Sequence, residues 1–180
     1  SSSGVISIMG GKLTTYRKMS EHTVDEVVKH TGKAKKCKTK NLQFIGAKGF
    51  KSSMSDGPDA HLAERFGSEL NRVKELIAQD SSLAEPLIAG LPYLRAEAVF
   101  ACRNEMAQTL DDVLSRRTRA RIINRRATLA SARKVAELMA TELHWDAAEI
   151  DRQVAFFVDS CSREEAAGLV SEAEFLASVQ

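Results

Sequence analysis

The residues with the clearest chemical potential lie near the start of the chain, where Gly10, Gly11 and Lys12 stand within the stretch Met-Gly-Gly-Lys-Leu-Thr-Thr-Tyr-Arg. Paired glycines let the backbone approach a ligand closely, because they carry no Cβ atom. The helical pattern that follows them adds free N–H groups and the positive end of a helix dipole. Lys12 adds a full positive charge at the same place. The stretch therefore predicts either a site for an anion or an electron-rich ring, or an ordinary strand-to-helix turn that binds nothing.

A strand and a helix must position this turn. Residues 5–9 form a short β-branched, apolar run between glycines, which predicts a strand. From Leu13 the apolar residues recur every three to four positions until Gly32, which predicts a helix that ends there. A lysine-rich run follows at 33–40, and a solvated linker explains it better than a polyanion-binding patch, since no aromatic residue interleaves the lysines. We therefore expect strand, glycine turn, helix and linker.

The rest of the chain has the pattern of a helical bundle. Asp146 is a good helix N-cap, and Trp145 beside it is expected to be a buried anchor between two helices. Glycine, serine and proline residues between 46 and 58 indicate a boundary. We therefore expect a mainly α protein in two parts, residues 1–56 and residues 57–180. Apolar positions three to four residues apart predict helices at 59–65, 68–79, 94–107, 109–115, 122–143 and 146–158, with a short last helix in the acidic tail 162–180.

The composition is that of an ordinary soluble globular protein. Of 180 residues, 43% are hydrophobic and 28% are charged, and no apolar run approaches the ~20 residues that cross a bilayer. The N-terminus has neither an initiator methionine nor a signal-peptide pattern, so we expect an excised piece of a cytoplasmic protein. Three widely spaced cysteines and four scattered histidines predict no disulfide framework and no metal site.

Residues 116–126 hold six arginines, the densest charge in the chain. They could follow the phosphates of a nucleic acid, but on one helix they spread around most of the circumference, whereas a groove-binding helix would gather them on one side. Glu105, Asp111 and Asp112 lie close upstream and can pair with them. Intramolecular ion pairs therefore explain this segment better than nucleic-acid binding. Glu97 and Glu105 could form a carboxylate pair for acid–base catalysis, but as partners of the arginines they need no catalytic role.

Two motifs resemble one enzyme family. Residues 7–22, Ser-Ile-Met-Gly-Gly-Lys-Leu-Thr-Thr-Tyr-Arg-Lys-Met-Ser-Glu-His, resemble the last flavin-binding segment of FAD-dependent glycerol-3-phosphate dehydrogenases of the aerobic type. Residues 105–119, with Met-Ala-Thr-Glu-Leu-His-Trp at 139–145, resemble the hallmark of the family's C-terminal helical domain. The resemblance covers essentially the whole chain, but the chain covers only the end of the family's protein. The Gly-x-Gly-x-x-Gly motif that holds the FAD pyrophosphate does not occur here, nor do the upstream substrate-binding residues.

The resemblance implies a role for each residue of the glycine turn. Gly10, Gly11, Lys12, Leu13 and Thr14 would lie against the isoalloxazine ring of FAD, and residues 1–56 would be the end of an α/β FAD-binding domain. Lys12 would have the catalytic role, stabilising negative charge on the N1–C2=O edge of the reduced ring. The parent enzyme would oxidise sn-glycerol 3-phosphate to dihydroxyacetone phosphate and pass electrons through FAD to quinone. The chain alone is expected to bind no FAD and to be inactive.

Two alternatives remain open. A glycerophosphate oxidase, which passes electrons to oxygen, fits the same residues. An accessory helical module would instead bind a protein or a nucleic acid through residues 116–126, and tight, salt-sensitive binding of nucleic acid would favour it. We expect no nucleic-acid partner. The resemblance leaves open whether the parent is a homodimer and whether it attaches peripherally to the cytoplasmic face of a membrane.

Overall fold

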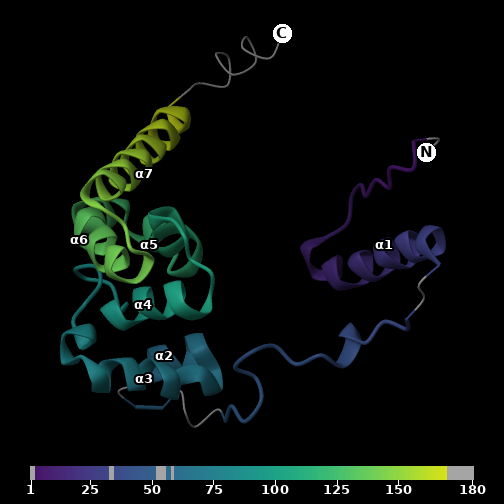
Figure 1. Ribbon diagram of the computed structural model, residues 1–180, viewed down its shortest axis with the longest axis horizontal. Helices are drawn as coiled ribbons and strands as arrows, with labels where there is room; N and C mark the ends of the chain where they lie inside the picture. The colour runs from purple at the N-terminus through teal and green to yellow at the C-terminus, as the bar shows by residue number, and fades with distance from the viewer. Residues whose placement is uncertain (1–2, 33–34, 52–55, 58, 170–180) are drawn as a thin grey trace. The chain divides into compact units, whose positions relative to one another are not determined.

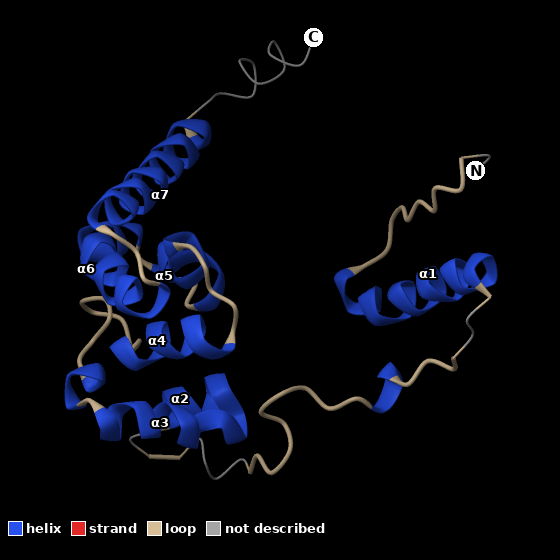
Figure 2. Cartoon of the chain, viewed as in Figure 1, coloured by secondary structure: helices blue, strands red, loops and turns tan. Residues whose placement is uncertain are grey.

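The computed structural model describes residues 3–32, 35–51, 56–57 and 59–169, and within these ranges every regular element is helical (Figure 1, Figure 2). The chain divides into two compact units, Ser1–Lys48 and Gly49–Gln180. The expected mainly α fold is therefore confirmed. The assignment of residues 1–56 to an FAD-binding domain stays a prediction.

The first unit is built around one helix. The 3-10 turn η1 (Leu13–Thr15) leads into α1 (Tyr16–Thr31), and η2 (Thr39–Asn41) follows. Gly32 ends α1 as predicted, because it adopts a left-handed φ of 70° and donates its N–H to the carbonyl of Val28 at 2.9 Å. No residue of α1 is buried. Most of the stability of a helix in a protein comes from packing of its apolar face, and α1 obtains little of this packing among the described residues.

The predicted strand at residues 5–9 is wrong. These residues have no strand conformation, and Val5, Ile8 and Met9 are 62%, 53% and 91% exposed. A strand exists only when a neighbour completes its ladder of hydrogen bonds, and no described segment pairs with this one. The strand-turn-helix remnant is thus an extended segment, a turn and a helix.

The second unit is a stack of helices. One core cluster lies between α2, α3 and α4 and includes Leu62, Val73 and Phe100, all buried. The other cluster joins α4 to α6 and α7 and includes Met139 and Phe157. Helix α4 therefore lies between the two layers and supplies side chains to both (Figure 1). The elements are α2 (Ala60–Phe66), η4 (Gly67–Glu69), α3 (Leu70–Gln79), η5 (Ser81–Ala84), α4 (Arg95–Asn104), the π-helix η6 (Asp112–Arg117), α5 (Ala120–Ile123), α6 (Arg125–Leu143) and α7 (Ala147–Gly168).

Three predicted helix boundaries need correction. The helix expected at 94–107 ends already at Asn104, and Met106 has a left-handed φ of 54°. The long helix expected at 122–143 is interrupted at Asn124, whose φ of −150° is not helical and whose side chain accepts a hydrogen bond from the N–H of Ala127 at 3.0 Å. Asn124 thus acts as the N-cap of α6 and separates it from α5. The tail does not form a separate helix, because α7 continues through residue 162 to Gly168. The remainder of the predicted tail helix, residues 170–180, lies outside the described residues.

The junction between α6 and α7 is close to the prediction. The Asp146 side chain accepts a hydrogen bond from the N–H of Glu149 at 2.8 Å, so the predicted N-cap is confirmed. Trp145, however, is only half-buried. Like Leu143 and Ile150, it packs against the core cluster that joins α4 to α6 and α7. It lies where the chain leaves α6, and a side chain at a helix junction keeps one edge in solvent.

Replacing Trp145 with alanine is expected to lower the urea midpoint of unfolding by less than a fully buried aromatic would. Full truncation of a buried aromatic costs ~3–5 kcal/mol, and the loss should scale with the part of the ring that is covered. Phe156→Ala is the control, because Phe156 is 56% exposed on α7 and should move the midpoint much less. Equal midpoints for Trp145→Ala and the unmodified chain would show that the ring contributes nothing to this junction.

Candidate functional site

The glycine turn of the first unit has the backbone that its sequence suggests. Gly10 and Gly11 have φ values of 78° and 96°, in the left-handed region that favours glycine. Lys12 is extended, and its carbonyl accepts hydrogen bonds from the N–H of Thr15 at 2.9 Å and from the Thr15 hydroxyl at 2.8 Å. The chain therefore turns from the glycine pair directly into the first helical turn.

The two sides of this turn differ. A Cβ atom at Gly11 would lie 2.2 Å from the sulfur of Met19, so Gly11 packs closely against α1. A Cβ atom at Gly10 would meet nothing within 4 Å, so this side of the backbone is open. Leu13 is 88% exposed beside it. The turn thus presents accessible backbone and an apolar side chain, which fits the face or edge of a planar ring.

Lys12 brings positive charge to the open turn. It is exposed and has no acidic partner among the described residues, and the first turn after it holds no acidic residue. An unpaired cation at the start of a helix is mildly unfavourable for the helix itself. Its presence is easier to understand if an anion or an electron-rich ring binds there. The five residues named from the sequence, Gly10, Gly11, Lys12, Leu13 and Thr14, therefore lie together in one continuous turn.

Most of the arginines at 116–126 are paired within the second unit, as predicted. Arg116 lies 2.7 Å from Asp111 and 3.0 Å from Asp112. Arg117 donates two hydrogen bonds to the carbonyl of Glu105, at 2.6 and 3.2 Å, and its guanidinium lies 3.9 Å from the Glu105 carboxylate. These contacts fix the π-helix η6 against the end of α4.

A second set of contacts ties the arginines to α7. Arg121 lies 2.7 Å from Glu164 and 3.4 Å from Asp111, and Arg125 lies 3.2 Å from Glu164. Arg121 also donates a hydrogen bond to the carbonyl of Ser160 at 3.0 Å. Four of the six guanidinium groups are therefore engaged inside the domain, which leaves little of the segment free to follow a phosphate backbone.

Glu97 does not join the arginines of 116–126, contrary to the prediction. It is fully buried on α4, where Oε2 lies 2.7 Å from Nε of Arg65 and Oε1 lies 3.2 Å from Nε2 of His61, both on α2. Oε1 also accepts a hydrogen bond from the N–H of Leu94 at 2.9 Å. The Arg65 guanidinium stacks over the ring of Tyr93 at 5.5 Å. Sequence reasoning missed this cluster, although His61 and Arg65 are one helical turn apart and so share a face.

The Glu97 cluster has the character of a structural ion pair. Burial raises the pKa of the Glu97 carboxyl, while the Leu94 N–H and the Arg65 charge act in the opposite direction. The Arg65 and Glu97 atoms that lie 2.7 Å apart are not aligned as a hydrogen bond. Because the Glu97 side chain is almost fully buried, its carboxylate can hold α2 on α4 but is not accessible to a substrate. The acid–base reading of Glu97 with Glu105 therefore finds no support in the geometry.

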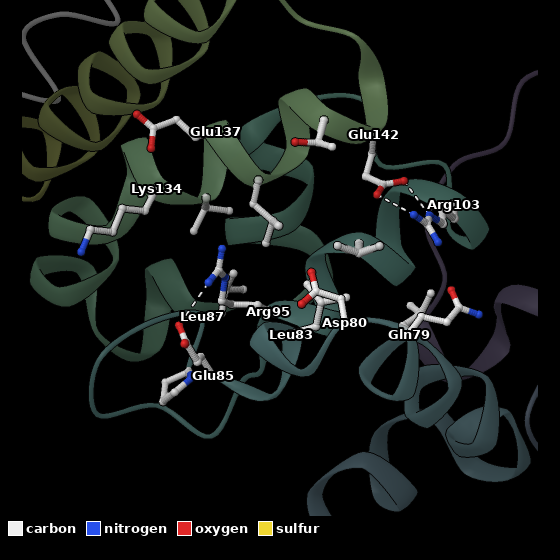
Figure 3. A pocket seen from close by; sticks show the side chains of 16 residues that line it. Gln79, Asp80, Leu83, Glu85, Leu87, Arg95, Arg103, Lys134, Glu137 and Glu142 are labelled. Carbon is white, nitrogen blue, oxygen red and sulfur yellow. Dashed lines mark hydrogen bonds and ion pairs between the residues drawn. The ribbon is translucent and has the colours of Figure 1, made fainter.

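The second unit also holds a cavity of about 800 Å³ between α3, η5, α4 and α6 (Figure 3). Its charged side chains are largely matched, since Arg95 lies 3.1 Å from Glu85, and Arg103 donates two hydrogen bonds to Glu142 at 2.6 and 2.7 Å. Lys134 lies at one end without an ion pair among the described residues. The lining combines charges of both signs with apolar side chains, and none of the lining residues pairs a nucleophile with an adjacent base.

Other reactive groups are scarce in the described part of the chain. Cys37, Cys102 and Cys161 are free thiols, and burial raises the pKa of Cys102 to about 11, so this thiol stays protonated at neutral pH. No three His, Cys, Asp or Glu side chains among the described residues are grouped to hold a metal ion. None of the described helices is long and apolar enough to cross a bilayer.

Comparison with known proteins identifies the family. Residues 37–150 match the family described as the C-terminal domain of alpha-glycerophosphate oxidase. Glycerol-3-phosphate dehydrogenase 2 of Mycobacterium tuberculosis is 33% identical over 168 residues, which cover 86% of this chain and 29% of the relative. The mitochondrial glycerol-3-phosphate dehydrogenase of Mesocricetus auratus is also 33% identical over 168 residues, covering 85% of this chain and 23% of the relative. No solved structure matches the chain.

The extent of these matches defines what the chain is. It spans less than a third of the length of the curated relatives that it matches. The family match takes in α2 to α6, which is most of the helical unit described above. Because the matched region is more than half of the chain, this protein belongs to the family of the C-terminal domain of alpha-glycerophosphate oxidase.

Proposed function

We propose that this chain is the C-terminal part of an FAD-dependent glycerol-3-phosphate dehydrogenase. The parent enzyme oxidises sn-glycerol 3-phosphate to dihydroxyacetone phosphate. The observation that carries the proposal is the alignment with a glycerol-3-phosphate dehydrogenase over 86% of this chain. Because that alignment takes in only 29% of the relative, this chain would be less than a third of the parent enzyme, and we expect the chain alone to be inactive.

The glycine turn gives the chain a part in the chemistry. When bound in the parent, FAD supplies the acceptor for the hydride of the substrate. The open backbone at Gly10 and the tight packing of Gly11 on α1 support a turn that lies against the ring, with Leu13 and Thr14 completing the contact. Lys12 would hold its ammonium near the ring edge that gains electron density on reduction. Its role is to stabilise that charge, as hydrogen-bond donors do in oxyanion holes.

Quinone is the proposed electron acceptor, with attachment of the parent to the cytoplasmic face of a membrane, because quinones dissolve in lipid. The relatives are named dehydrogenases, which favours this acceptor, whereas the family description names an oxidase, for which the acceptor would be oxygen. The parent should reduce a quinone analogue with glycerol 3-phosphate and form little hydrogen peroxide. One peroxide formed for each substrate oxidised would identify a glycerophosphate oxidase instead.

The purified chain is expected to be colourless and to reduce no dye with glycerol 3-phosphate. The chain has no Gly-x-Gly-x-x-Gly motif to hold the FAD pyrophosphate, and a single turn against the ring cannot retain the cofactor. Absorbance spectra after gel filtration test this expectation, with the parent enzyme as the flavin-containing control. A yellow fraction in which flavin coelutes with the isolated chain would show that the chain holds a complete site of its own.

A further inference from the structure

An exposed apolar surface lies beside the π-helix of the second unit. We use the name 106–123 face for Arg119, Ile122 and Ile123, which share the turn after η6, together with Met106 in the segment that Arg117 ties to η6. Met106, Ile122 and Ile123 are 82%, 78% and 58% exposed, which is unusual for three large apolar residues in one region of a well-packed domain. The Arg119 carbonyl accepts the N–H groups of Ile122 and Ile123, at 3.0 and 3.2 Å, so three members of the face are held in one short turn.

Two residues of this face have strained backbones. Met106 and Arg119 have φ values of 54° and 56°, a left-handed conformation that is costly for side chains other than glycine. They flank η6, a π-helix of six residues, and such helices are rare and often occur at functional sites. Strain of this kind persists only where the surrounding structure imposes it, and it is concentrated at functional sites.

Internal contacts hold the strained face in shape. Arg117 joins the segment that carries Met106 to η6 through its two hydrogen bonds to the Glu105 carbonyl. Thr118, the residue immediately before Arg119, is buried, and its hydroxyl donates a hydrogen bond to the carbonyl of Val113 at 2.7 Å. These interactions act on the residues beside the face and leave its own side chains exposed. The face is therefore preorganised before any partner arrives.

We propose that the 106–123 face is the surface through which the helical domain docks onto the rest of the parent polypeptide. This inference rests on the proposed function, because the partner is the remaining part of the parent polypeptide. That part is about three quarters of the parent, since the chain covers 23% and 29% of two relatives. An apolar centre beside exposed cations is the pattern of a docking surface whose partner offers an apolar pocket with carboxylates at its rim.

The distribution of charge favours that partner over a second copy of the chain. Arg119 and Arg126 are exposed and have no ion pair among the described residues, whereas the other four arginines of the segment are paired internally. A twofold dimer centred on this face would bring Arg119, one of these two unpaired cations, against its own copy. A partner of different sequence can present acidic groups to them.

The test is binding of this chain to the remaining polypeptide of the parent, produced as a separate chain. The double variant Ile122→Asp, Ile123→Asp should bind about tenfold or more weakly, because it places two carboxylates in the apolar centre of the interface. Both side chains are exposed, so the variant should fold normally, which circular dichroism can verify. Phe156→Asp is the matched control, since Phe156 is exposed on α7 away from the face and should leave the affinity unchanged.

Met106→Gly gives an independent readout of the strain. Glycine adopts the left-handed φ freely, so the isolated chain should gain about 2–4 °C in melting temperature. The same variant should bind the remaining polypeptide more weakly, because it removes an apolar contact. A lower melting temperature would mean that the Met106 side chain stabilises the domain internally, which contradicts a docking role.

The remaining outcomes separate the two proposals. If the unmodified chain does not bind the remaining polypeptide, the proposed function fails first. If it binds and the aspartate variant binds equally well, the docking surface lies elsewhere and the inference is overturned. It is also overturned if light scattering shows a dimer of the isolated chain that the aspartate variant dissociates, or if vesicles of anionic lipid bind the chain only when Ile122 and Ile123 are intact.

Discussion

Replacing Lys12 with methionine in the parent enzyme is expected to lower turnover about 100-fold or more, as loss of an oxyanion-hole donor does. The Lys12 side chain is exposed at an open glycine turn and has no acidic partner among the described residues. In the proposed function its ammonium would stabilise charge that develops on the flavin. Methionine keeps most of the side-chain length and removes the charge. Turnover at saturating substrate, flavin content and melting temperature should be measured on the same preparation.

Lys18→Met is the matched control for this substitution. Lys18 is on α1, is about half exposed and pairs with Glu21 at 3.2 Å. Its replacement therefore removes one lysine charge from the helix that follows the turn and leaves the turn itself unchanged. We expect it to leave turnover unchanged. Lost turnover with normal flavin content in Lys12→Met alone would support the catalytic role. Near-normal turnover in Lys12→Met would make Lys12 an ordinary solvated lysine at a helix start.

Replacing Glu97 with alanine is expected to lower the free energy of unfolding by about 3–5 kcal/mol, the range found when one partner of a buried ion pair is removed. The substitution leaves the largely buried Arg65 guanidinium without its carboxylate and the Leu94 N–H without its acceptor. Urea denaturation followed by circular dichroism measures the loss. Because α2 and α4 meet at the Arg65–Glu97 ion pair, loss of the pair should also loosen the apolar core cluster between α2, α3 and α4.

A double-mutant cycle separates the ion pair from simple loss of packing. Arg65→Met combined with Glu97→Leu removes both charges and should be less destabilising than the sum of the two single variants, because neither charge is left buried alone. Glu97→Gln should fall between the unmodified chain and Glu97→Ala, since the amide oxygen can still accept from Leu94. Additive losses across the cycle would mean that Arg65 and Glu97 do not depend on each other.

The helices could be predicted from sequence because their apolar stripes extend over several turns. The segment expected at 68–79 is observed as η4 and α3, from Gly67 to Gln79, and the N-cap at Asp146 was visible as a local pattern. The break at Asn124 was missed because the apolar spacing continues across it, although an N-cap side chain was present in the sequence. Local preference can interrupt a helix without changing its hydrophobic period.

The prediction of a strand at residues 5–9 was wrong for a different reason. A helix completes its hydrogen bonds within its own segment, whereas residues 5–9 need a neighbouring strand that no described residue supplies. The candidate site residues likewise divide into those that are close in sequence and those that only the fold brings together. The glycine turn and Lys12 are contiguous in sequence and could be named from it, but His61 and Glu97 are 36 residues apart and meet only when α2 packs on α4.

Anaerobic reduction of flavin by glycerol 3-phosphate tests most directly whether this chain is part of a glycerol-3-phosphate dehydrogenase. The remaining polypeptide of the parent should be loaded with FAD, mixed with substrate, and followed by absorbance with and without this chain. We expect the flavin to bleach rapidly only when this chain is present, because in the proposed function the turn that carries Lys12 would complete the flavin site. Equal bleaching without the chain, or no bleaching when the two are bound together, would contradict this role.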